Sequence, residues 1–107
     1  MDEKKIEVIL GHYTPEQQTI KAIEELAELQ SELARILNKQ GDLKNLKSEC
    51  ADTYIMLTQI MIIYDIDSEE FLKEVAFKLD RQIMRIRNEK KTGVDCGWKQ
   101  EGSCSMQ

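Results

Sequence analysis

Aromatic residues and proline are scarce in this 107-residue sequence. Aromatic residues make up 6% of the chain, charged residues make up 33%, and Pro15 is the only proline. β-Strands favour aromatic and β-branched residues, so this composition is more typical of helices. We therefore expect an all-α fold in a single domain, small enough to gain stability from pairing with a second copy.

Histidine and cysteine are too few for several common kinds of site. His12 is the only histidine, so a di-iron bundle with its Glu-x-x-His pairs is excluded, and covalent catalysis by a Ser–His or Cys–His pair has no support. The cysteines are Cys50, Cys96 and Cys104, and their odd number and spacing fit neither a disulfide framework nor a zinc-ligand pattern.

Long apolar runs and an excess of basic residues are also missing. The longest apolar run, residues 54–64, is interrupted by Thr58 and Gln59 and is too short to cross a bilayer, and no signal-type apolar core follows residues 1–5. The net charge is −5 with acids and bases interleaved, which argues against binding to nucleic acid or anionic lipid. We expect a cytoplasmic protein that meets an anionic ligand locally, through a metal or a few cations.

Capping signals predict a short helix followed by a long one. Residues 2–11 have the pattern of a short amphipathic helix or turn that Gly11 should end. In residues 14–17, Thr-Pro-Glu-Gln forms a capping box with proline at the first helical position. The long helix should therefore begin at Pro15 and continue to about Asn38 or Lys39, with Gln40-Gly41 ending it.

Two further long helices are expected, over residues 43–64 behind an Asp42 cap and over residues 68–90. Residues 1–91 would then form an antiparallel bundle of three long helices and one short N-terminal helix, completed by dimerisation. From residue 92 onward, glycine and polar residues predominate and Trp98 is the only large apolar group. We expect residues 92–107 to be a flexible tail.

Apolar periodicity predicts which face of each helix is buried. The first long helix has an apolar stripe, with Glu25, Glu28 and Glu32 just outside it as if on a solvated face. The second is apolar nearly all round from Cys50 onward, as expected of a central helix, and Asp52 points towards packed neighbours. The stripe of the first helix comprises Ile20, Ile23, Leu26, Ala27, Leu33, Ala34 and Leu37. The predicted core stripe of the last helix comprises Phe71, Leu72, Val75, Leu79, Ile83 and Ile86.

Two pairs of carboxylates stand out on the first two long helices. Glu25 and Glu28 share one side of the first helix, and Glu49 and Asp52 share one side of the second, because residues three apart point the same way. If the helices are antiparallel, the pairs can face each other. Four converging carboxylates need a cation, and magnesium typically uses a few carboxylates together with substrate phosphates.

Three cations, Lys78, Arg81 and Arg85, follow one edge of the last helix. They could reach a neighbouring acidic cleft or bind phosphate oxygens. The alternative is a solvated flank on which Lys78 pairs with Glu74 at i, i+4.

The couplets Glu25-x-x-Glu28 and Glu49-x-x-Asp52, the first of them within the string at residues 21–29, resemble the MazG-like all-α nucleoside triphosphate pyrophosphohydrolases. The resemblance extends over roughly residues 12–86. It implies hydrolysis of a nucleoside triphosphate to its monophosphate and pyrophosphate, by water activated by Mg²⁺ or Mn²⁺, in clearance of the nucleotide pool. Glu25, Glu28, Glu49 and Asp52 would be the metal ligands and catalytic residues.

Further expectations concern the basic residues of the last helix, Glu24 and the assembly of the chain. Lys78, Arg81 and Arg85 would stabilise the pyrophosphate. Glu24 could act as an outer-shell base, although a surface role is the simpler interpretation. We expect a homodimer or a dimer of dimers, with the site near the subunit boundary. The competing hypothesis is a non-enzymatic oligomerisation or binding module that assembles through the apolar segment at residues 54–63.

Overall fold

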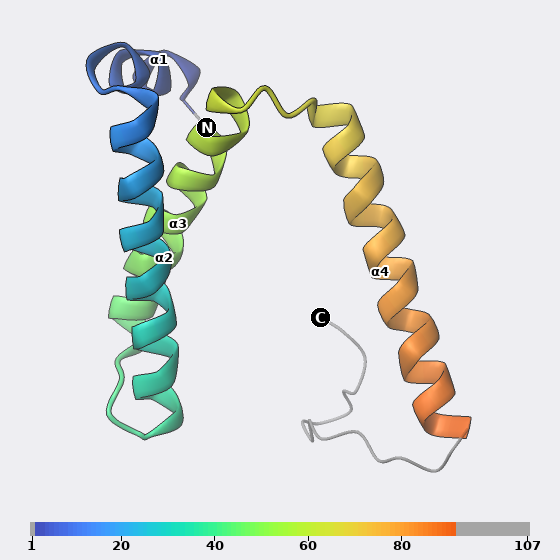
Figure 1. The fold of residues 1–107 in the computed structure, drawn as a ribbon. Coiled ribbons are helices and arrows are strands. Elements are labelled where there is room, and N and C mark those ends of the chain that lie inside the picture. The colour runs from blue at the N-terminus through green and yellow to red at the C-terminus, as the bar shows by residue number, and fades with distance from the viewer. Residues whose placement is uncertain (1, 92–107) are drawn as a thin grey trace. The chain divides into compact units, whose positions relative to one another are not determined.

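The computed structural model describes residues 2–91, which consist of helices and the turns between them. In chain order the helices are α1 (Glu3–His12), α2 (Pro15–Leu37), α3 (Leu43–Ile63) and α4 (Ser68–Lys91), and no strand occurs in this range (Figure 1). The all-α prediction is confirmed. The expected tail with Cys96, Trp98 and Cys104 lies outside the described residues.

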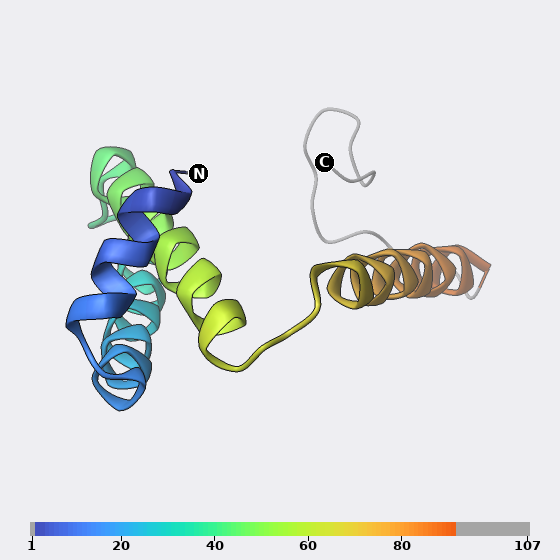
Figure 2. The same cartoon turned by 90° about the horizontal axis from the view of Figure 1, so that it is seen from above.

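The chain divides into two compact units at Asp67 and Ser68. Helices α1, α2 and α3 belong to the first unit, in which α2 and α3 pack against each other as an antiparallel hairpin (Figure 1). Helix α1 lies beside the C-terminal half of α3 (Figure 2). At this contact Ile6 and Glu7 line a small hollow with Thr58 and Ile62. Helix α4 belongs to the second unit, so the bundling of all three long helices stays a prediction.

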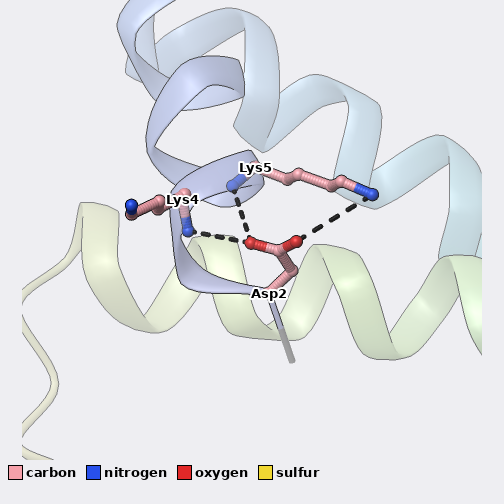
Figure 3. Close-up of polar contacts among 3 residues, drawn as sticks. All are labelled: Asp2, Lys4 and Lys5. Atoms are coloured by element: carbon pink, nitrogen blue, oxygen red, sulfur yellow. Dashed lines mark hydrogen bonds and ion pairs between the residues drawn. The ribbon is translucent and has the colours of Figure 1, made fainter.

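Helix α1 begins at a side-chain cap and does not end at its glycine. The Asp2 carboxylate accepts hydrogen bonds from the backbone N–H groups of Lys4 (3.1 Å) and Lys5 (3.3 Å) and pairs with the Lys5 ammonium at 3.9 Å (Figure 3). The helix continues through Gly11 to His12. One glycine costs a helix only about 1 kcal/mol relative to alanine. The effective stop is the extended backbone before Pro15, where proline disfavours the helical region.

The predicted capping box at the start of α2 is confirmed. The Thr14 hydroxyl accepts from the Gln17 N–H at 3.0 Å, and the Gln17 side chain accepts from the Thr14 N–H at 2.9 Å. Helix α2 ends at Leu37, close to the predicted end at Asn38 or Lys39, and the left-handed residue after it is Lys39, with φ of 61°. Gly41 is needed because its backbone lies close to that of Ile36. A Cβ on residue 41 would lie 2.8 Å from the Ile36 nitrogen.

Polar residues occupy most of the contact between α2 and α3. The residues of α2 that are buried here are Gln18, Ala22, Glu25 and Glu32. They recur at intervals of three, four and seven, and so share one face. On α3 the buried residues are Met56 and Gln59, and the Gln18 amide donates a hydrogen bond to the Gln59 side-chain oxygen at 2.8 Å.

The apolar stripe predicted for α2 is not covered within the first unit. Ile20, Ile23, Leu26, Leu33 and Leu37 of the predicted stripe are 46–84% exposed, because the acidic face of α2 is the one that meets α3. Periodicity shows which residues share a face but not which face finds a partner helix.

The other two apolar surfaces are also more open than predicted. Helix α3 was expected to be covered on several sides, yet Tyr54, Leu57 and Ile62 are exposed because α3 meets only α1 and α2 within its unit. Most of the predicted core stripe of α4 is exposed as well, since α4 is the only described helix of its unit.

Candidate metal centre

Three carboxylates converge between α2 and α3. Glu25 of α2 and Glu49 and Asp52 of α3 each offer one oxygen, and these three oxygens lie within 4.8 Å of one another. Glu49 and Asp52 are one helical turn apart and so point the same way. The antiparallel packing brings Glu25 opposite them. The facing of carboxylates across two consecutive helices, predicted from the sequence, is present for these three residues.

Two of the three carboxylates have an oxygen that is buried and lacks a hydrogen bond within residues 2–91. Glu25 is only 8% exposed to solvent. One oxygen of Glu25 and one of Glu49 are buried without a hydrogen-bond partner among the described residues, as is the hydroxyl of the neighbouring Thr53. Buried polar atoms in folded proteins are nearly always paired, so these oxygens call for an additional ligand. Three carboxylates are a hard oxygen donor set that suits Mg²⁺, Mn²⁺ or Ca²⁺.

The electrostatics of Glu49 point to the same need. Burial raises the pKa of the Glu49 carboxyl above its ordinary 4.5, and the nearby charges of Glu28, Asp52 and Glu25 raise it further, in that order. Each of these effects disfavours the ionised form of Glu49. A divalent cation among the carboxylates would act in the opposite direction, by favouring ionisation of all of them.

Glu28 lies at the edge of this group. Its side chain is exposed, and it does not belong to the set of three converging oxygens. Nevertheless its charge is the largest carboxylate contribution to the raised pKa of Glu49. Of the four ligands predicted from the sequence, three converge and the fourth lies close enough to influence them.

Lys21 is the residue that the sequence interpretation missed. Its ammonium nitrogen lies 3.3 Å from one oxygen of Glu25 and 3.8 Å from Glu24. The hydrogen bond to Glu25 is the main cause of a raised pKa of Lys21. The i, i+4 spacing of Lys21 and Glu25 was the available signal. Glu24, predicted as an outer-shell candidate, is exposed, and it pairs with Lys21 rather than joining the converging oxygens.

Glu32 was expected on a solvated face and is instead buried, at 7% exposure. One of its oxygens accepts a hydrogen bond from the Asp42 backbone N–H at 2.9 Å, and the other lies 3.6 Å from the Arg35 side chain. Asp42 in turn caps α3 through the Lys44 N–H at 2.8 Å. Glu32 therefore links α2 to the start of α3 and helps to set the register at which Glu25 meets Glu49.

A hollow of about 330 Å³ lies on the side of α2 that carries Lys21 and Glu24. Its lining residues are Tyr13, Gln17, Gln18, Ile20, Lys21 and Glu24. Lys21 belongs to this lining and also pairs with Glu25, so one side chain connects the hollow with the converging oxygens. The volume is at the small end of the range for ligand sites.

The predicted basic edge of α4 has contacts within its own helix. Lys78 pairs with Glu74 at 3.8 Å, as the alternative interpretation proposed, and the Arg81 guanidinium lies 5.8 Å from the centre of the Phe77 ring. Helix α4, which carries Lys78, Arg81 and Arg85, belongs to the second unit and is described by itself. Their role in phosphate binding stays a prediction.

Comparisons of the chain with protein-family profiles, curated proteins and solved structures found no match. Among the described helices, none combines the length and apolar character that spanning a membrane requires. Function is therefore inferred from the carboxylate group and its surroundings.

Proposed function

We propose that this protein is a magnesium-dependent nucleoside triphosphate pyrophosphohydrolase of the MazG-like type. It would hydrolyse the bond between the α and β phosphates, releasing a nucleoside monophosphate and pyrophosphate and so clearing nucleotides from the pool. The observation that supports this proposal is the convergence of Glu25, Glu49 and Asp52, with two buried oxygens that lack a partner. A triphosphate carries several negative charges, and a cation held by carboxylates is the means by which an acidic protein can bind it.

Glu25, Glu49 and Asp52 would hold the ion, with Glu28 as the fourth carboxylate. Bound Mg²⁺, or Mn²⁺ in its place, supplies activation of water and neutralisation of phosphate charge. Glu24 lies outside this set and could accept a proton as an outer-shell base. Lys78, Arg81 and Arg85 are the proposed partners of the leaving pyrophosphate. No protein nucleophile is required, in keeping with the single histidine of the chain.

The proposal is tested by assaying pyrophosphate and monophosphate release from a panel of ribo- and deoxyribonucleoside triphosphates with Mg²⁺ or Mn²⁺. We expect metal-dependent release by the parent protein, and a loss of at least about 100-fold in Glu25→Gln, Glu49→Gln and Asp52→Asn. Glu16→Gln is the matched control, because Glu16 is an exposed acid of α2 outside the carboxylate group. Absence of pyrophosphate release from every substrate, or full activity in all three variants, would refute the proposal.

A non-enzymatic oligomerisation or binding module is the second candidate. It is favoured by the exposed apolar side chains of α2 and α3, such as Ile23, Leu26 and Tyr54. For the enzyme, the same surface suits a homodimer or a dimer of dimers with the site near the subunit boundary. Light scattering with and without Mg²⁺, beside the pyrophosphate assay, separates the candidates. The module assembles independently of the metal and releases no pyrophosphate.

A further inference from the structure

We infer that Lys21 exchanges partners when the site is loaded. In the metal-free protein its ammonium group pairs with Glu25. A divalent metal bound to Glu25 displaces it towards the adjacent hollow, where it binds a phosphate group of the substrate. The metal-exchange step requires only that the carboxylates bind a metal, whereas the phosphate step rests on the proposed function.

The first observation is the position of the Lys21 ammonium at one of the converging carboxylates. It lies 3.3 Å from one oxygen of Glu25, whose other oxygen is buried without a partner. Glu25 is more than nine-tenths buried, and it shares the space between α2 and α3 with Glu49 and Asp52. A divalent ion bound there would carry twice the charge of Lys21 at closer range to the same oxygens, so the two cations compete for Glu25.

The second observation is that the Lys21 side chain can move away from Glu25 into the adjacent hollow. Its side chain is 51% exposed, so the ammonium group can swing on its flexible four-carbon stem. It already lines the hollow of about 330 Å³ beside Tyr13, Gln17 and Ile20. In that position a free ammonium group meets ligands that approach the metal from the α2 side. A phosphate group is the expected partner, because an ammonium group binds phosphate oxygens as a point charge.

The pair differs from an ordinary surface ion pair. On α1, Lys5 pairs with Asp2 at 3.9 Å with i, i+3 spacing, but their side chains are 82% and 54% exposed. The Glu25 side chain is only 11% exposed and lies among other carboxylates. Lys5 therefore provides a control for substitutions of Lys21.

The first arm of the test measures Mn²⁺ binding to the full chain without nucleotide, by electron paramagnetic resonance of the free ion. We expect Lys21→Met to bind Mn²⁺ about three- to tenfold more tightly than the parent, because a competing cation is removed. Lys21→Arg keeps the charge and should bind Mn²⁺ nearly as the parent does, and Lys5→Met should be unchanged. Circular dichroism of each variant checks that it is folded.

The second arm measures binding of a nucleoside triphosphate analogue that cannot be cleaved between its α and β phosphates, in saturating Mn²⁺. Lys21→Met should bind it about tenfold more weakly, with recovery in Lys21→Arg. Inorganic pyrophosphate is titrated in parallel. An equal loss for pyrophosphate would show that Lys21 binds the pyrophosphate part, and a loss for the analogue alone would assign it to the nucleoside monophosphate part.

Unchanged or weaker Mn²⁺ binding by Lys21→Met would overturn the exchange. Tighter Mn²⁺ binding with unchanged affinity for both phosphate ligands would overturn the phosphate step. The proposed function fails separately, if the parent protein binds Mn²⁺ through the carboxylates but hydrolyses no nucleoside triphosphate.

Discussion

Replacement of Glu49 by glutamine is expected to stabilise the metal-free protein and to remove its response to magnesium. Burial raises the pKa of Glu49 above 4.5, and the charge of Glu28 adds to the effect. The folded state therefore holds this proton more tightly than the unfolded state does. As the pH rises through the interval between the ordinary and the raised pKa, the free energy of unfolding decreases, and at neutral pH it stays lowered. Glutamine is uncharged and is not repelled by the neighbouring carboxylates, so the free energy of unfolding of the variant is not lowered in this way.

Magnesium should reverse the loss in the parent protein. For an ion that binds only the folded state, a free concentration roughly ten times Kd adds about 1.4 kcal/mol to the free energy of unfolding. In a domain of this size each kcal/mol raises the melting temperature by about 4–8 °C, so the rise should be about 6–11 °C. In Glu49→Gln one of the three converging oxygens loses its charge, and the rise should largely disappear.

Thermal unfolding followed by far-UV circular dichroism, with and without Mg²⁺ at acidic and neutral pH, tests both the higher stability of metal-free Glu49→Gln and its lost response to magnesium. Glu16→Gln is the control for the loss of an acid from the same pair of helices. An equal magnesium response in Glu49→Gln and in the parent would refute the assignment of Glu49 as a ligand. A metal-free Glu49→Gln that is no more stable than the parent at neutral pH would refute the electrostatic argument.

Three other substitutions test the packing around the site. Glu32→Ala should lower the free energy of unfolding by about 1.5–3 kcal/mol in urea denaturation, because the Asp42 N–H loses a charged acceptor at 2.9 Å. Arg35→Ala removes only an exposed partner of Glu32 and should lower the free energy of unfolding far less. Gln59→Leu leaves the buried Gln18 amide without its acceptor and should cost about 1–3 kcal/mol, and the double substitution with Gln18→Leu should recover much of this in the same assay. Leu26→Asp places a charge on the exposed apolar face of α2 and should shift the predicted oligomer to monomer in light scattering, whereas an unchanged mass would exclude this face from the interface.

Local signals in the sequence predicted the helices well. Thr14 and Asp42 cap their helices as expected, because a capping hydrogen bond depends only on residues two or three positions away. The position at which α2 ends was predicted closely, but the residue that makes the turn was not. Gly41 suggested a glycine-type helix end, but Lys39 supplies the left-handed residue and Gly41 provides room beside Ile36.

The site was predictable only in part because it depends on the choice between two faces of α2. The wheel of α2 alone favoured the face of Ile23 and Leu26, and the acids beside it resembled a solvated surface. Consideration of α2 and α3 together predicted the facing carboxylates of Glu25 and Glu49 correctly. The pairing of Glu32 with the Asp42 backbone could not be read from spacing, since it depends on the path of the turn.

The α2–α3 contact is organised as three polar layers seven residues apart, which places neighbouring layers roughly 10 Å apart along the helix. At one end Glu32 accepts from the Asp42 N–H, and at the other Gln18 donates to Gln59. Both outer layers are hydrogen-bonded across the contact, and they hold the two helices in register. In the described part of the chain, the middle layer, around Glu25, brings three carboxylates together with only the Lys21 ammonium group beside them, and it retains buried oxygens without partners. Because the outer layers oppose any sliding of the helices, the carboxylates are held close together, and a divalent cation between them would offset their repulsion.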